Sequence, residues 1–271
     1  MAIVDPPEHV AKLLYKEWIK VIIQIIGLPG SGKTELARAL KERINAIHLN
    51  ADEVRASVNS DLSFTVEDRI EHARRMGNMA VLLSKQGFNV IVDFVCPTEE
   101  TREAFGFAHL VVWVDRIKEG RFEDTNKIWE DPSYYDIKIG NGMTVKEEAD
   151  YIIEIGQLFD WSAPTTLQLG RYQPWHEGHQ ALKTEAHRRT KQVLVGVRNT
   201  YGTSDKDPMS YKQVEDLIWQ QNINGNTLVL RLPNITNIVY GRDVGYKIEQ
   251  VDLGAEIHAI SATQKRKEMG L

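Results

Sequence analysis

In the first part of the chain, short apolar runs alternate with stretches whose apolar positions recur at helical spacing. Continuous apolar runs at residues 21–26, 47–49, 89–94 and 109–114 are typical of strands buried on both faces. Residues 35–43, 66–85 and 146–158 have the spacing of amphipathic helices. This alternation predicts a parallel α/β fold.

A second alternation begins after the linker-like segment at residues 161–164. Strands are expected at residues 166–169, 192–197 and 227–232, and helices at residues 178–189, 211–221 and 262–269. The pattern therefore predicts two α/β domains, residues 1–161 and residues 162–271, each beginning with a strand followed by a helix.

Composition narrows the class of protein. Thirty-three basic and 38 acidic residues give a net charge of -5, which disfavours a non-specific nucleic-acid binder or a membrane-surface protein. A single cysteine, Cys96, excludes an internal disulfide and a structural zinc site built from cysteines. The N-terminal region carries no recognisable targeting signal or membrane span, so we expect a cytoplasmic protein.

The first chemical motif is a glycine-rich loop at residues 27–34, which fits G-x-x-x-x-G-K-[ST] between a predicted strand and helix. Its glycines let backbone N–H groups turn toward a phosphate, Lys33 reaches the β- and γ-phosphates, and Thr34 binds Mg²⁺. The predicted nucleotide-binding residues are Gly27, Gly30, Ser31, Gly32, Lys33 and Thr34.

The segment that follows supplies candidates for a phosphoryl acceptor site. Asp52, at the end of the second strand, can orient a hydroxyl nucleophile or hold Mg²⁺ through water. Arg55 and Arg69 can bind an anionic acceptor. Phe64 can stack on a base, or it can pack in the core.

Three further residues have two interpretations each. Asp93 ends an apolar strand, where it can order Mg²⁺ or simply cap the strand end. Arg116 and Arg121 can form a lid over the phosphates, or they can lie on a solvated helix.

These segments resemble the adenylylsulfate kinase family. The resemblance rests on residues 27–34, 49–55, 59–64 and 68–75, continues through residues 88–97, and covers about residues 20–155. It implies a P-loop kinase domain that phosphorylates the 3′-hydroxyl of adenylylsulfate with ATP. It carries over Asp52 as a catalytic residue and Arg55, Phe64 and Arg69 as acceptor-binding residues.

The chain departs from the family pattern at several positions. Asn50 stands where the family has its first aspartate, His72 replaces an asparagine, and Cys96 replaces a serine. Residues 123–129 replace a later family segment. These departures leave an alternative function open, that of a kinase for another small hydroxyl compound.

The second motif is a histidine pair at a predicted helix start. His176 and His179 lie about one helical turn apart, where neutral imidazoles and the helix dipole favour phosphate oxygens. Gly178 lets a nucleotide approach closely. A metal site is the alternative, but no third ligand follows at ligand spacing.

The last predicted helix carries a second group of polar residues. Ser261, Thr263 and Arg266 can bind the β- and γ-phosphates from the other side. H-x-G-H followed by I-S-x-T-x-x-R resembles the nucleotidylyltransferase superfamily, with a Rossmann-like domain over residues 165–271. Arg198 can bind an acceptor phosphate or lie at a solvated strand end.

This second resemblance implies direct displacement at the α-phosphorus of ATP or CTP, with release of pyrophosphate. The charge that develops in this reaction would be neutralised by His176, His179, Arg266 and Mg²⁺. We therefore expect a bifunctional transferase that binds small nucleotides and a small anionic acceptor, with no nucleic-acid or membrane partner and with a homodimer left open. Two alternatives remain: a kinase for a different metabolite joined to a cytidylyl- or adenylyltransferase, and a nucleotide sensor with one inactive half.

Overall fold

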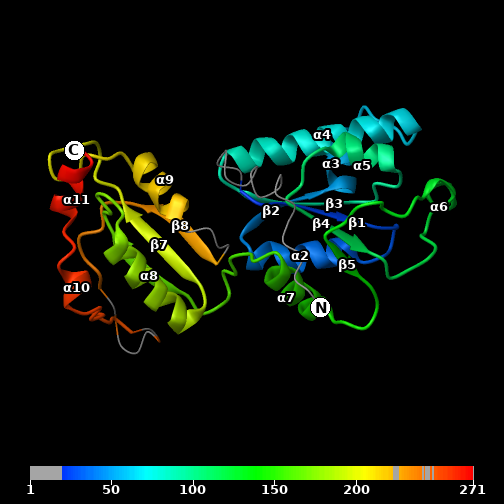
Figure 1. Cartoon of the computed structure of the whole chain (residues 1–271). Coiled ribbons are helices and arrows are strands. Elements are labelled where there is room, and N and C mark those ends of the chain that lie inside the picture. Colours follow the sequence, from blue (N-terminus) through cyan, green and yellow to red (C-terminus); the bar gives the residue numbers. More distant parts are fainter. Residues whose placement is uncertain (1–19, 222–225, 240, 242–244, 246, 271) are drawn as a thin grey trace. The chain divides into compact units, whose positions relative to one another are not determined.

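The computed structural model describes residues 20–221, 226–239, 241, 245 and 247–270. The chain divides into two compact units, Met1–Gly156 and Gln157–Leu271, coloured blue to green and green to red in Figure 1. The division falls five residues before the domain boundary expected from the sequence, residue 161, because α7 ends at Ile155.

Within its described residues, the first unit is built around a five-stranded parallel sheet in the order β2-β3-β1-β4-β5. The strands are β1 (Ile22–Ile26), β2 (Ala46–Asn50), β3 (Asn89–Phe94), β4 (Leu110–Val114) and β5 (Ile137–Ile139). The helices are α2 (Lys33–Arg43), α3 (Ala51–Ser57), α4 (Val66–Lys85), α5 (Glu99–Phe105), α6 (Glu123–Ile128) and α7 (Val145–Ile155).

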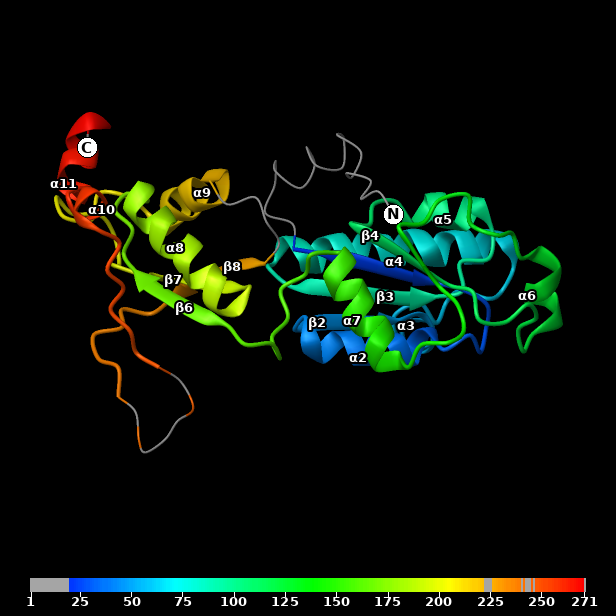
Figure 2. The same ribbon diagram turned by 60° about the horizontal axis from the view of Figure 1, so that its bottom comes forward.

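Helices cover both faces of this sheet. Figure 1, together with the turned view in Figure 2, shows α4 and α5 on one side of the strands and α2 and α7 on the other. The side chains of Ala73, Met76 and Ala80 on α4 pack in one core cluster with Ile22 and Val90. Because both faces are buried, the central strands are almost continuously apolar, which is why their positions could be predicted.

The second unit contains, in its described part, a three-stranded parallel sheet in the order β6-β7-β8. Its strands are β6 (Thr166–Gly170), β7 (Val193–Arg198) and β8 (Thr227–Leu232). Its helices are α8 (Glu177–Thr190), α9 (Tyr211–Gln221), α10 (Ala255–His258) and α11 (Ala262–Glu268). Val193, Val195 and Val197 of β7 form its core with Val214 and Ile218 of α9.

The predicted strands and helices are confirmed with bounds within a few residues. The structure adds α3, α5, α6, α10 and β5, which the apolar pattern did not predict. All five are seven residues or shorter, so they offer too few positions for a period to be recognised. No helix among the described residues is long and apolar enough to cross a bilayer.

Candidate active site

The glycine-rich loop connects β1 to α2 at the carboxyl edge of the first sheet. Gly30 and Gly32 have φ angles of 91° and 93°, in the region that L side chains rarely adopt. A Cβ on Gly27 would lie 2.5 Å from the carbonyl oxygen of Val114, so only glycine fits there. The backbone therefore takes the narrow turn that a phosphate-binding loop requires.

Lys33 begins α2 and is turned back onto the loop. Its Nζ donates to the carbonyl oxygen of Leu28 at 2.8 Å, and the residue is 7% exposed. Burial lowers the pKa of Lys33 to about 8, although the negative charges of Asp93 and Asp52 act to raise it. The ammonium therefore lies within the field of both carboxylates that the sequence predicted as site residues.

Thr34 and Asp93 meet at the start of α2 and the end of β3. The Thr34 hydroxyl donates to Asp93 Oδ2 at 2.6 Å, and His48 Nε2 lies 2.6 Å from Asp93 Oδ1. Burial raises the pKa of Asp93, but hydrogen bonds from His48, Thr34 and Asn50 hold the net pKa below its usual value. A hydroxyl and an ionised carboxylate are hard oxygen donors, so these residues fit Mg²⁺ bound together with substrate phosphates.

Asn50 has two structural roles that the sequence did not reveal. Its Oδ1 accepts from the backbone N–H groups of Asp52 and Glu53, both at 3.1 Å, which caps α3. Its Nδ2 donates to Asp93 at 3.1 Å. A carboxylate at position 50 could cap the helix but could not donate to Asp93. The amide of Asn50 therefore makes a contact with Asp93 that an ionised aspartate at position 50 could not make.

The predicted acceptor residues Arg55, Phe64 and Arg69 lie together at the α3–α4 connection. The guanidinium carbons of Arg55 and Arg69 lie 4.7 and 5.5 Å from the centre of the Phe64 ring. Phe64 is 64% exposed, so the alternative of core packing is wrong. Arg69 also pairs with Asp124 of α6 at 2.8 Å, which connects the acceptor residues to the segment that departs from the family pattern.

The other two departures lie in the interior. His72 is 4% exposed, and its Nδ1 lies 2.8 Å from Asn59 Nδ2. Burial lowers the pKa of His72 to about 4, so the ring is neutral. Cys96 is also buried, and burial raises the pKa of its thiol to about 12, which removes it as a nucleophile at neutral pH.

Arg116 and Arg121 lie between β4 and α6, so the alternative that places them on a solvated helix is wrong. Arg116 Nη1 donates to the carbonyl oxygen of Ser31 at 3.1 Å. The Arg121 side chain lies against Gly30. Both arginines thus contact the phosphate-binding loop.

In the second unit, His176 and His179 lie side by side at the start of α8. Their rings are stacked with centroids 3.8 Å apart, and His176 Nδ1 accepts from the backbone N–H of Gly178 at 3.2 Å. Burial lowers the pKa of His179 to about 4, and burial also lowers the pKa of His176. Two neutral imidazoles therefore face the positive end of the helix dipole.

The terminal helix α11 contacts this histidine motif. Arg266 Nη1 donates to the carbonyl oxygen of Gln173 at 2.8 Å, and its Nη2 donates to Thr263 Oγ1 at 3.1 Å. Lys265 pairs with Glu177 at 3.2 Å. Ser261 is exposed at the helix start, without a side-chain capping bond. The last helix and the histidine motif, which are distant in the sequence, are therefore in contact.

A cavity of about 240 Å³ opens where the two motifs meet. Its lining residues are Arg171, Tyr172, Gln173, His179, Lys206, Asp207, Ala262 and Arg266. Four of these side chains carry formal charge, and three of the four are basic. The cavity is therefore suited to an anionic ligand.

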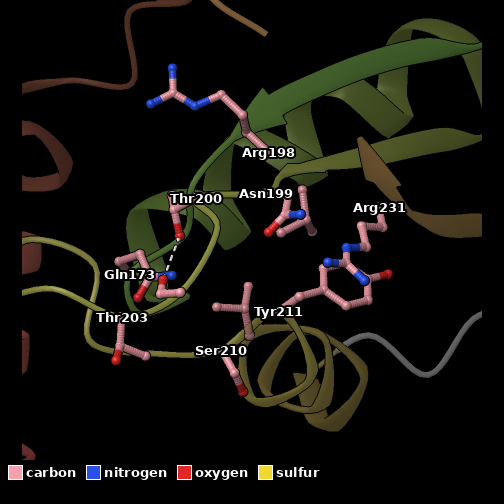
Figure 3. Close-up of a pocket in the computed structure, with 11 residues that line it drawn as sticks. Gln173, Arg198, Asn199, Thr200, Thr203, Ser210, Tyr211 and Arg231 are labelled. Carbon is pink, nitrogen blue, oxygen red and sulfur yellow. Dashed lines mark hydrogen bonds between the residues drawn. The ribbon is translucent and has the colours of Figure 1, made fainter. Parts of the chain in front are cut away.

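Arg198 ends β7, where the sequence places it, and borders a second cavity of about 160 Å³. Its Nη1 donates to the carbonyl oxygen of Ile235 at 3.2 Å. In Figure 3 its guanidinium points away from Tyr211 and Arg231. The guanidinium of Arg231 instead lies 5.3 Å from the centre of the Tyr211 ring. The only sequence signal for Arg231 was a charged residue within an otherwise apolar strand.

A parallel sheet with a phosphate-binding loop after β1 and a Thr–Asp pair beside it is the arrangement of P-loop nucleotide-binding domains. The sequence model of the adenylylsulphate kinase family matches residues 19–112. These residues are therefore similar to adenylylsulfate kinases, although the match is shorter than the expected resemblance and covers no part of the second unit.

Individual relatives agree with this family match. The chain is 42% identical over 88 residues to an adenylyl-sulfate kinase of Paraburkholderia xenovorans, covering 31% of this chain and 49% of that protein. It is 37% identical over 101 residues to the bifunctional enzyme CysN/CysC of Xylella fastidiosa, covering 35% of this chain and 16% of that enzyme. The chain thus spans about half the length of the adenylyl-sulfate kinase and much less of the bifunctional enzyme.

Among solved structures, the chain is similar to the Mycobacterium tuberculosis APS kinase CysC in complex with AMPPNP and APS. The two share 23% sequence identity with a TM-score of 0.47, and the match covers 51% of this chain and 97% of that one.

Proposed function

We propose that the first unit transfers the γ-phosphoryl group of ATP to a hydroxyl group of adenylylsulfate. The observation that carries the proposal is the Arg55–Phe64–Arg69 cluster, which lies within the stretch that matches the adenylylsulphate kinase family. An exposed aromatic ring flanked by two guanidinium groups suits an acceptor that has both a base and an anionic group. The relatives named as adenylyl-sulfate kinases support this choice of acceptor.

In the proposed reaction, the acceptor oxygen attacks the γ-phosphorus and the bond to the ADP oxygen breaks. Lys33 neutralises the phosphate oxygens, and Asp52 orients the attacking hydroxyl and takes its proton. Mg²⁺ held through Thr34 and Asp93 would offset the charge that develops on the phosphates. Asn50 donates a hydrogen bond to Asp93 and keeps that carboxylate in place.

The proposal is tested by ADP release in the presence of ATP and adenylylsulfate, compared with a panel of other small hydroxyl compounds. Asp52→Asn should lower kcat more than it raises the KM for the acceptor, because Asp52 acts on the attacking oxygen. Glu53→Gln, one residue further along the same exposed helix turn, is the matched control. Release of ADP with another acceptor but not with adenylylsulfate would overturn the acceptor assignment and leave the kinase class in place.

A second function is favoured by a separate observation: His179 and Arg266 line one cavity, and the ring of His176 stacks on that of His179. This arrangement supports a nucleotidylyltransferase activity for the second unit, with ATP or CTP as donor. An acceptor oxyanion would attack the α-phosphorus and pyrophosphate would leave, while His179 and Arg266 stabilise the developing charge.

Pyrophosphate release from ATP and from CTP, with phosphate-bearing and sulfate acceptors, tests this second function. His179→Ala should abolish the release, whereas Arg188→Ala, an exposed substitution on the same helix, should not. Nucleotide binding without any release of pyrophosphate would instead support a sensor in which this unit is inactive.

A further inference from the structure

The cavity of about 160 Å³ beside β7 and α9 is not explained by the donor nucleotide site. It lies at the carboxyl end of β7, the edge at which open parallel sheets bind ligands. Its walls come from the end of β7, the following loop, the start of α9 and Arg231 of β8 (Figure 3). Gln173 lines both this cavity and the cavity of the histidine motif. A ligand here would therefore lie next to a nucleotide bound at His179.

The charge of the lining favours an anion. Arg198 and Arg231 border the cavity, and none of its lining residues is acidic. The guanidinium of Arg198 is engaged with the Ile235 carbonyl and points away, which leaves Arg231 as the cation on the side of Tyr211. Burial and the nearby carboxylate of Glu215 raise the pKa of Tyr211, so its hydroxyl stays neutral.

The size and the polarity of the walls favour an organic group in addition to the anion. A cavity of about 150 Å³ holds a ligand of the size of benzene, so this cavity has room for more than one tetrahedral ion. Thr200, Thr203 and Ser210 contribute hydroxyl groups to the lining, and Val197 and Val214 contribute apolar side chains. The Thr200 and Ser210 hydroxyls donate to Gly202 and Gln213, and their oxygens can still accept bonds from ligand hydroxyls.

We propose that this cavity is the acceptor site of the second unit, and that its ligand is a small organic phosphomonoester whose phosphate contacts Arg231. The acceptor role rests on the nucleotidyl transfer proposed above. In that reaction a non-bridging oxygen of the acceptor phosphate forms a new bond to the α-phosphorus of the nucleotide. The bond between that phosphorus and the β-phosphate oxygen breaks, and its electron pair leaves with pyrophosphate, so no other reactant is needed.

Calorimetric titration of the full chain tests the site without turnover, with ribose 5-phosphate, glycerol 3-phosphate and inorganic phosphate as probes. At least one phosphomonoester should bind more tightly than inorganic phosphate. Arg231→Ala should weaken its binding about 10- to 100-fold, the usual effect of losing a hydrogen bond to a charged group. Arg231→Lys should restore part of the affinity, and Arg198→Ala should weaken binding less than Arg231→Ala does.

Arg188→Ala serves as the control for loss of one positive charge, because Arg188 lies on the exposed surface of α8. The thermal unfolding midpoint of each variant separates a binding effect from a folding effect. The site is overturned if neither phosphomonoester binds more tightly than inorganic phosphate, or if Arg231→Ala binds as the wild type does. Arg231-dependent binding without pyrophosphate release from any nucleotide would overturn the acceptor role together with the transfer function, while the phosphomonoester site would stand.

Discussion

Arg116 connects the phosphate-binding loop to a buried carboxylate on α7. One end of its guanidinium donates to the carbonyl oxygen of Ser31, and the other end pairs with Glu148, which is fully buried. A buried charge is stable only when it is paired, so Glu148 holds the guanidinium in one position. That position lies directly against Gly32. The pair therefore sets the shape and the charge of the loop from a helix outside it.

Glu148→Gln should raise the KM for ATP about tenfold, because the guanidinium is no longer held on the loop. It should also lower the free energy of unfolding by about 3–5 kcal/mol, since one buried charge loses its partner. The measurements are steady-state kinetics and urea unfolding. Asp150→Asn is the matched control, because Asp150 pairs with Arg43 at the exposed surface of the same helix.

A double variant separates the two effects of Glu148. Glu148→Gln combined with Arg116→Gln removes both charges, so most of the stability should return while the weak ATP binding remains. If Glu148→Gln alone binds ATP as the wild type does, the pair has a structural role only.

Exposed Phe64 should be needed for acceptor binding but not for ATP binding. Base–aromatic stacking is worth about 1–3 kcal/mol, so Phe64→Ala should raise the Kd for adenylylsulfate about 10- to 100-fold. Phe88→Ala is the control, since Phe88 is also exposed but lies at the other end of α4. Equal acceptor affinity in the Phe64→Ala variant and the wild type would exclude stacking on this ring.

The strands and long helices of both units were predictable because buried parallel strands are apolar throughout and because α4 has enough turns to show its period. The short helices depend on single capping residues: Asn50 caps α3 and Thr98 caps α5. The sequence showed that Asn50 replaces the aspartate of a family motif. It did not show that Asn50 caps a helix, because the short helix α3 was not predicted.

Within the site, the phosphate-binding loop was predictable because the residues that form it are consecutive in the sequence. The contacts of Arg116 with Glu148 and of Arg231 with Tyr211 were not, because each joins residues far apart in the sequence. The sequence placed Arg198 at a strand end, and the residue borders the cavity there. Its hydrogen bond to the carbonyl oxygen of Ile235 depends on a residue further along the chain and was not predictable.

Stability should fall as the pH falls from neutral toward 5. Burial lowers the pKa of His72, His109 and His179 to about 4, whereas the same side chains in the unfolded chain titrate near 6.5. Below about pH 6.5 the unfolded state therefore binds more protons than the folded state. The stability that is present above that pH is lost as the pH falls toward 4.

His109 offers the clearest test, because its Nδ1 must stay unprotonated to accept from the backbone N–H of Ile22 at 2.9 Å. Urea unfolding between pH 7.5 and 5 should show a smaller loss of stability in His109→Gln than in the wild type. An unchanged pH dependence would mean that His109 does not contribute to it.

The two proposed activities should be lost independently. Lys33→Ala should lower phosphoryl transfer by about 100- to 1,000-fold and leave pyrophosphate release unchanged. His179→Ala should have the opposite effect. ADP and pyrophosphate are assayed in parallel on each variant, with circular dichroism to verify the fold. Loss of both activities in either variant would contradict separate sites.

The central claim concerns the reaction of the first unit, and mass spectrometry of the products tests it most directly. The full chain is incubated with ATP, Mg²⁺ and adenylylsulfate, and Lys33→Ala is incubated in the same way. We predict adenylylsulfate carrying one added phosphoryl group on its 3′-hydroxyl, formed by the wild type and nearly absent with the variant. Phosphorylation of a different hydroxyl compound with no such product, or equal product from Lys33→Ala, would contradict the account.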